Sequence, residues 1–165
     1  MNPTDRQKAD SGRPVGYRLP PVFHRVLPAS PLAVRDTLCD VRARFARSAP
    51  PDTLGRLELV MAEVLNNVVQ HAARQSGGLP AQKPLSIHLS ILRTRHGFAC
   101  AVTDDGESMP NGCLVPHDLP DSEDSGPPEG GFGWFMIQSL TQTLYYHRAE
   151  DRNCLAFSIA SAQPA

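Results

Sequence analysis

The sequence predicts an α+β protein in which about three helices cover one face of a mixed, mostly antiparallel sheet. Two observations predict this class. Segments with helical spacing and segments with alternating polarity follow each other in the order β, α, α, β, β, loop, α, β, β. The chain also has 165 residues, of which 41% are hydrophobic, so it can bury a real core. We expect one domain over residues 19–162.

The first half begins with a strand and two helices. Residues 23–30 alternate in polarity, and Ser30 and Pro31 then supply an N-cap and a first-turn residue for a helix to about Ser48. A second helix is predicted from about Pro51 to Arg74, with Asp52 or Thr53 as its cap. An apolar stripe along this helix is expected to face the sheet. Its members are Leu54, Leu57, Met61, Val64, Leu65, Val68 and Ala72.

The second half is predicted to contain two strand pairs and a helix. Residues 85–95 and 97–105 alternate as strands joined at His96-Gly97. Residues 131–144 suggest a helix that opens at a glycine, and residues 144–150 and 153–160 suggest a strand pair that turns near Asp151-Arg152. The Pro- and Gly-rich segment 110–131 predicts a long loop, which is usually either functional or disordered. Residues 1–18 lack apolar periodicity and predict a flexible arm.

Composition argues against several classes of function. The 16 basic and 17 acidic residues give a net charge of −1, which offers no electrostatic footprint for nucleic acid or an anionic membrane. The N-terminus has no apolar signal region, and no apolar run is long enough to span a bilayer. The four cysteines form no CxxC pair and suggest reduced thiols. We expect a cytoplasmic protein without direct contact to nucleic acid or membrane.

One side of the second predicted helix collects polar side chains. Glu63, Asn67 and His71 are spaced i, i+4, i+8, roughly opposite the apolar stripe, with Asn66 and Gln70 beside them. A solvated face explains most such patterns. However, two successive asparagines are unfavourable inside a helix, which favours a functional reason for them.

Two other segments carry candidate chemistry. In residues 102–110, VTDDGESMP, acidic and glycine residues follow a strand, either as a turn or as side chains at the edge of a pocket. In residues 129–137, EGGFGWFMI, glycines precede a helix whose free N–H groups suit an anion, although a plain helix start remains open. Neither a Walker A nor a Rossmann glycine pattern is present.

Together these segments resemble the boxes of the GHKL, or Bergerat-fold, ATPase superfamily. Glu63-x-x-x-Asn67-x-x-x-His71 is similar to the N box, Asp104-x-Gly106-x-x-x-Pro110 to the G1 box, and Gly131-x-Gly133 to the G2 box. Residues 108–130, approximately, take the place of the ATP lid. The small size, the wording NNVVQHA and the tail of the chain most resemble the anti-sigma-factor serine kinases, over roughly residues 24–160.

The resemblance implies ATP and Mg²⁺ as cofactors. It makes Glu63 the catalytic base, Asn67 the ligand of Mg²⁺, and Asp104 the acceptor for the adenine amino group. Gly106 would let the base approach the backbone. The residues implied in binding the nucleotide are Asn66, Asn67, His71, Asp104, Gly106, Gly131, Phe132 and Gly133.

The implied function is that of an ATP- and Mg²⁺-dependent serine/threonine protein kinase and anti-sigma factor. It would phosphorylate a small anti-anti-sigma protein of the STAS type, sequester an alternative sigma factor, and form a homodimer. The alternative is a non-catalytic ATP-binding regulatory module that sequesters a protein partner. Glu63 favours the kinase, whereas Ser108, where many relatives carry a second glycine, mildly favours the module. An unrelated α+β domain is the third interpretation.

Overall fold

The computed structural model describes residues 22–75, 85–109, 114 and 132–161. The predicted order of elements is confirmed. The elements are β1 (Val22–Pro28), α1 (Pro31–Phe45), α2 (Pro51–Gln75), β2 (Ser86–Thr94), β3 (Gly97–Asp104), α3 (Phe132–Leu140), β4 (Thr143–Ala149) and β5 (Arg152–Ala160). The arm predicted for residues 1–18 lies outside the described residues.

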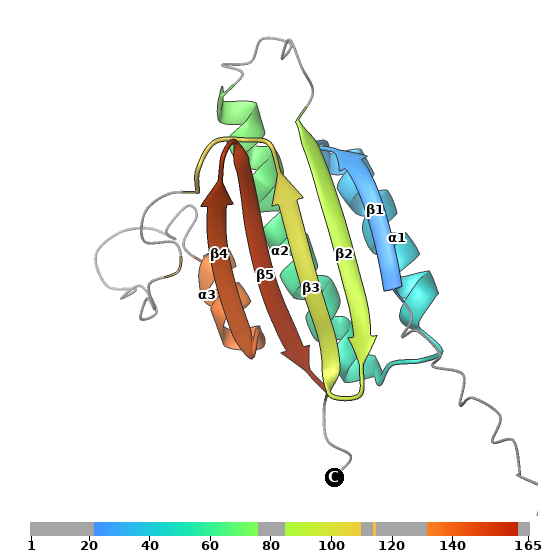
Figure 1. Cartoon of the computed structure of the whole chain (residues 1–165). Coiled ribbons are helices and arrows are strands. Elements are labelled where there is room, and N and C mark those ends of the chain that lie inside the picture. The colour runs from blue at the N-terminus through green and yellow to red at the C-terminus, as the bar shows by residue number, and fades with distance from the viewer. Residues whose placement is uncertain (1–21, 76–84, 110–113, 115–131, 162–165) are drawn as a thin grey trace, which may run out of the picture.

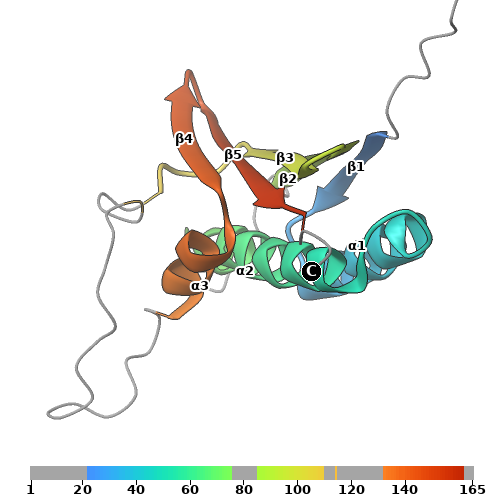
Figure 2. The ribbon, with the colours of Figure 1, turned by 90° about the horizontal axis from the view of Figure 1, so that it is seen from below.

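The five strands form one sheet in the order β1-β2-β3-β5-β4. All four neighbouring pairs among these described strands are antiparallel, so the sheet contains no parallel pair there. The helices lie behind the sheet in Figure 1, with α2 between α1 and α3. Figure 2 shows all three helices on the same side of the sheet. The predicted α+β sandwich is therefore confirmed.

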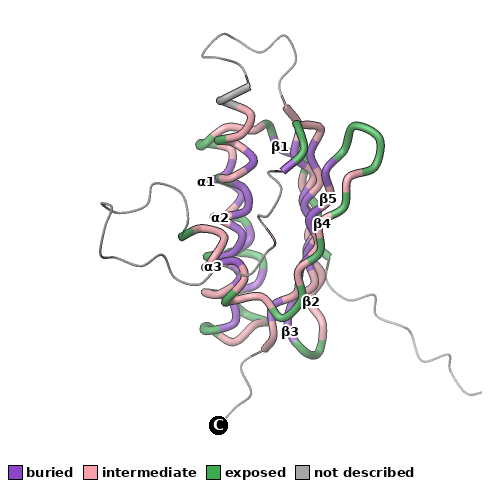
Figure 3. The backbone as a smooth tube through the Cα atoms, turned by 90° about the vertical axis from the view of Figure 1, so that its left-hand side faces the viewer, coloured by how far each residue is buried: buried purple, intermediate pink, exposed green. Residues whose placement is uncertain are grey.

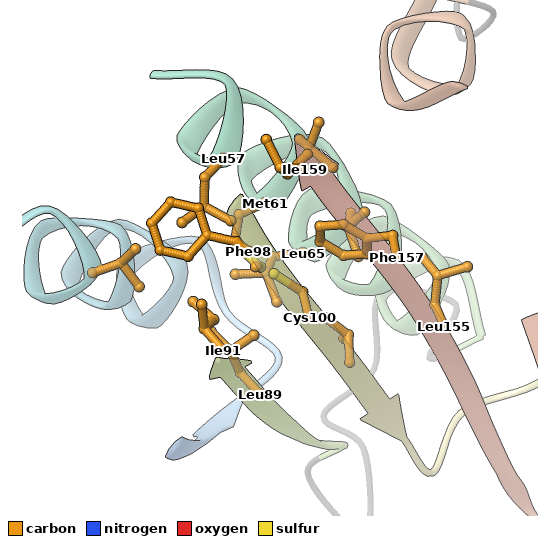
Figure 4. Close-up of a cluster of buried hydrophobic side chains, with 14 of the residues drawn as sticks. Leu57, Met61, Leu65, Leu89, Ile91, Phe98, Cys100, Leu155, Phe157 and Ile159 are labelled. Carbon is orange, nitrogen blue, oxygen red and sulfur yellow. The ribbon is translucent and has the colours of Figure 1, made fainter. Parts of the chain in front are cut away.

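The core fills the space between the helix layer and the sheet. Buried positions line the inner sides of both layers in Figure 3, and alternate residues of β2, β3 and β5 are buried because successive strand side chains point to opposite faces. Figure 4 shows side chains of α2 meeting those of the three central strands. In the predicted stripe, six side chains are at most 7% exposed and Ala72 is partly buried.

The core also contains a cysteine thiol. Its side chain is buried on β3, and burial raises the pKa of the thiol, so the group stays protonated. The described cysteines, Cys39, Cys100 and Cys154, are all free.

The β2–β3 hairpin depends on a glycine. Gly97 has a φ of +136°, and a Cβ at this position would lie 1.8 Å from the carbonyl oxygen of Ile159 on β5. Any other residue would force the hairpin away from β5. The turn predicted at His96-Gly97 is confirmed.

Helix boundaries differ from the predictions in three places. Ser30 caps α1 as predicted, since its hydroxyl accepts from the amide of Ala33, but the helix ends at Phe45 and not near Ser48. Helix α2 already begins at Pro51, so Asp52 and Thr53 lie in its first turn and are not its cap. Helix α3 ends at Leu140, not at residue 144. The Thr141 side chain there bonds to the carbonyl of Ile137, and β4 begins two residues later.

Candidate functional site

The polar residues of α2 lie along one flank of its apolar stripe. Glu63, Asn67 and His71 are all partly buried. Four residues turn a helix by about 400°, so each step from residue 63 to 71 rotates the side chain about 40° further toward the core. The prediction that this trio lies opposite the stripe therefore holds for Glu63, whereas Asn67 and His71 lie progressively closer to the stripe. Asn66 and Gln70 occupy the outer side and are exposed.

The N-terminus of α3 meets this flank at Gly133, the second residue of the helix. A Cβ on Gly133 would lie 2.7 Å from Oε2 of Glu63 and 4.0 Å from Nδ2 of Asn67. The missing side chain therefore leaves room for the Glu63 carboxylate. The first turn of α3 contains no acidic residue, so its free N–H groups and partial positive charge are available beside Glu63 and Asn67.

Asn67 has an unused hydrogen-bonding group. Its amide nitrogen Nδ2 is buried and bonds to no other group in the described part of the chain. Buried polar atoms are rarely left without a partner, because the desolvation penalty then goes uncompensated. An orphaned amide beside a helix N-terminus is the condition expected of a ligand site.

A second group of candidate residues surrounds a small cavity at the end of β3. The lining residues are Val68, His71, Leu85, Asp104, Gly106, Glu107, Met109 and Asn153. The Asp104 side chain is buried, at 5% exposed, and faces the helix layer. This cavity is partly open, and its volume is about 10 Å³, which holds about one water molecule. The described residues alone therefore leave no room for a purine base at this position.

The two adjacent aspartates of this segment do different things. Asp105 accepts from the backbone amide of Ser86 and so fixes the start of β2. Asp104 accepts through Oδ1 from the backbone amide of Gly106 at 2.9 Å. A Cβ on Gly106 would lie 2.9 Å from Asp104 Oδ1 and 2.7 Å from a methyl carbon of Leu85, so only glycine fits this turn without displacing them. Asp104, as the sequence suggests, is the aspartate that lines the cavity.

Three residues that the sequence analysis did not single out complete this end of the site. Asn153 on β5 is 2% exposed and donates to Asp104 Oδ1 at 2.8 Å. Tyr146 and Arg148 on β4 both donate to the Asn153 side-chain oxygen, at 2.8 and 2.7 Å. A signal did exist, because an asparagine at an inward-facing strand position needs buried partners. Only the β3–β5 register, which pairs Asp104 with Asn153, identifies those partners.

The candidate residues thus form two groups connected by α2. Glu63, Asn67 and Gly133 form one, and His71, Asp104 and Gly106 form the other. Asn67 does not line the Asp104 cavity described above, but it lies one helical turn from His71, which does.

The remaining candidates are not brought into either group. Asn66 and Phe132 are exposed, and Gly131 lies outside the described residues. The segment expected to form a lid, about 108–130, is described only at Ser108, Met109 and Leu114.

The central helix α2 thus carries Glu63 and Asn67 beside the start of α3 and reaches the cavity at Asp104. The sequence pattern of the histidine kinase-like ATPase domain family matches residues 27–159, and the chain belongs to this family. The resemblance to the GHKL superfamily is confirmed.

A curated relative and a solved structure add to this assignment. The chain is 30% identical over 107 residues to the serine/threonine-protein kinase BtrW of Bordetella bronchiseptica. The aligned segment covers 64% of this chain and 70% of that protein. The resemblance to the family of anti-sigma-factor serine kinases is confirmed by this match and the family assignment. The fold is similar to that of the RsbU and RsbW domains of Rv1364c from Mycobacterium tuberculosis, with a TM-score of 0.55 and 14% identity. That match covers 88% of this chain and about a third, 34%, of the other.

Two further findings concern the described residues only. No helix among them is long and apolar enough to cross a membrane. No three of their His, Cys, Asp or Glu side chains are grouped so that they could hold a metal ion by themselves.

Proposed function

We propose that this protein is an ATP- and Mg²⁺-dependent serine/threonine protein kinase and an anti-sigma factor. Its substrate is a small anti-anti-sigma protein of the STAS type, and its other partner is an alternative sigma factor, which it holds as a homodimer. Membership of a kinase-like ATPase family and the BtrW relative support the kinase part. The site residues support the chemistry as follows.

The observation that carries the proposal is the meeting of Glu63, Asn67 and the start of α3. Phosphoryl transfer needs a base near the attacking hydroxyl, a metal ion on the phosphates, and donors that neutralise their charge. Glu63 is the base, Asn67 lies one turn away, and the N–H groups at the start of α3 lie next to both. The proximity of these three groups supports the proposal.

The residues also fit a magnesium ion that arrives with its nucleotide. Mg²⁺ takes few protein oxygens and fills its remaining positions with water and phosphate oxygens, so it does not need a cluster of three protein carboxylates. The amide oxygen of Asn67 is the ligand. When bound, the ion would neutralise charge on the transferring phosphate.

The other end of the site is suited to adenine. Asp104 accepts a hydrogen bond from the amino group of the base, and Gly106 keeps the adjoining backbone free of side-chain bulk. The cavity wall beside Asp104 is apolar and consists of Leu85, Met109 and Val68. His71 lines the same cavity and so contacts the adenosine end of the nucleotide.

Nucleotide binding is tested by the shift in melting temperature on adding Mg·ATP. Wild-type protein is expected to melt higher with Mg·ATP, because a ligand that binds only the folded state stabilises it. Asp104→Asn is expected to lose most of this shift. Asp36→Asn, an exposed aspartate on α1, is the matched control and should keep the shift. An unchanged melting temperature for the wild type would contradict nucleotide binding itself.

Phosphotransfer is tested with γ-³²P-labelled ATP and purified small STAS-domain proteins as acceptors. Wild type should label one of them, Glu63→Gln should label it about 100-fold more slowly or worse, and the exposed Glu150→Gln control should match wild type. Equal labelling by Glu63→Gln would overturn the base assignment. Tight Mg·ATP binding without any labelling would favour the non-catalytic regulatory module.

A further inference from the structure

The Asn153 side chain uses every hydrogen-bonding position that an amide has. An amide nitrogen carries two hydrogens and an amide oxygen carries two lone pairs. The nitrogen donates to Asp104 Oδ1 at 2.8 Å and to the carbonyl of Glu107 at 2.7 Å. The oxygen accepts from Arg148 at 2.7 Å and from the Tyr146 hydroxyl at 2.8 Å. The orientation of the amide is therefore fixed by two donors on one side and two acceptors on the other.

The same contacts tie down the backbone that follows Asp104. Arg148 also donates to the carbonyl of Gly106 at 2.9 Å, and the Tyr146 hydroxyl accepts from the amide of Met109 at 3.1 Å. The β4–β5 hairpin thus holds residues 104–109 at both ends. This turn does not depend on a second glycine at Ser108, whose hydroxyl lies 3.3 Å from that of Tyr146.

The bonds to Asp104 are unequal between its two oxygens. Oδ1 accepts from both the Gly106 amide and Asn153, whereas Oδ2 bonds to nothing in the described part of the chain. Asp104 also lines the cavity. With Oδ1 occupied, the carboxylate cannot rotate without breaking two hydrogen bonds, and Oδ2 is left for a ligand.

We propose that Asn153 is the positioning residue for nucleotide selection: it holds Asp104 so that Oδ2 accepts the amino group of adenine and repels the carbonyl that guanine has at the same place. The inference rests on the proposed function. A carboxylate oxygen held toward the base accepts hydrogen bonds, so it matches an amino group and opposes a carbonyl oxygen. Asn153 acts on the base through Asp104.

The test exchanges the donor while keeping the shape. Asn153→Asp keeps an oxygen for Tyr146 and Arg148 but turns the group that faces Asp104 from a donor into an acceptor. Affinities for Mg·ATP and Mg·GTP are measured by calorimetry, and melting temperatures are recorded without nucleotide. His147→Asp adds the same charge at an exposed position of β4 and is the matched control.

We expect Asn153→Asp to raise the Kd for Mg·ATP at least about tenfold and to narrow the preference for ATP over GTP, as losing a charge-assisted hydrogen bond would. In a double-mutant cycle, Asn153→Asp in an Asp104→Asn background should add less than about twofold, because both changes remove one interaction. If Asn153 had a purely structural role, Asn153→Asp would weaken ATP and GTP binding equally. Its effect on the Kd would then multiply with the effect of Asp104→Asn.

Each other outcome has a defined meaning. Should Asn153→Asp fail to fold, Tyr146→Phe takes its place, with an expected rise in Kd of about threefold from losing the hydroxyl that donates to the Asn153 oxygen and accepts from the Met109 amide. The inference fails while the proposed function stands if wild type binds Mg·ATP and the Asn153 variant binds like His147→Asp. The inference also fails if the effects of Asn153→Asp and Asp104→Asn on the Kd for Mg·ATP multiply in the double-mutant cycle. A wild-type protein that does not bind Mg·ATP contradicts the proposed function first and the inference with it.

Discussion

Replacing Gly133 by alanine should separate the stability of this protein from its activity. The added Cβ would lie 2.7 Å from Oε2 of Glu63, whereas ordinary contacts begin at 3.4 Å. The Glu63 carboxylate must therefore move by about 0.7 Å. It is the free end of a flexible side chain on a partly buried position, so it can move without disturbing the core.

The expected consequences have opposite signs. Alanine is a better helix residue than glycine by up to about 1 kcal/mol, so the free energy of unfolding should stay equal or rise slightly. A base displaced by a large fraction of an ångström is poorly placed for proton abstraction, and misplacement on this scale can slow a reaction by about 100-fold. We expect phosphotransfer to fall by about tenfold to 100-fold, with Mg·ATP affinity changed much less.

Gly55 provides the matched control. It also lies in a helix, but a Cβ there would have nothing within 4 Å. Gly55→Ala should therefore raise the free energy of unfolding by about 0.5–1 kcal/mol and leave phosphotransfer unchanged. The assays are urea denaturation followed by circular dichroism, and initial rates of label transfer from γ-³²P-ATP. Full activity in Gly133→Ala would refute the placement of Glu63 at the start of α3.

Three further expectations follow from single contacts. Gly106→Ala places a Cβ 2.9 Å from Asp104 Oδ1 and 2.7 Å from Leu85, so calorimetry should show weaker Mg·ATP binding, and unaltered affinity would contradict the tight turn. Ser30→Ala removes the cap of α1 and should lower the free energy of unfolding by about 1 kcal/mol without changing the Kd for ATP. Burial raises the pKa of Cys100 above its ordinary value of 9.0. Above pH 9.0 the thiol therefore ionises in the unfolded chain while it stays protonated in the folded protein, so the free energy of unfolding falls as the pH rises. Above pH 9.0 the free energy of unfolding of wild type should fall by about 1.4 kcal/mol per pH unit relative to that of Cys100→Ala. Parallel plots of this free energy against pH for the two proteins would refute the raised pKa.

Local patterns predicted the elements of the fold well, because apolar spacing and end signals are local. The stripe of α2, the Ser30 cap and the Gly97 turn each depend on a few neighbouring residues, and all three are confirmed. The predicted end of α3 is too late because Ile137, Leu140 and Leu144 follow a helical spacing across the true end of the helix. The side-chain bond from Thr141 to the helix backbone shows where the helix stops.

The candidate site was predictable only where its residues share an element. Glu63, Asn67 and His71 come from one helix, but their partial burial was not predictable, because Gly133 of α3 lies 70 residues further along the chain from Glu63. Asn153 could not be connected to Asp104, because they are 49 residues apart and meet only through the β3–β5 register. Tyr146 and Arg148 depend on the same pairing.

The most direct test is a titration of isotope-labelled protein with Mg·ATP, following the backbone amides of Gly106 and Gly133 by NMR. These amides report on the two groups of site residues. One nucleotide spanning both should shift both signals along the same saturation curve, whereas adenosine alone should shift Gly106 and leave Gly133 in place. Movement of only one amide with Mg·ATP, or different saturation curves for the two, would contradict a single site.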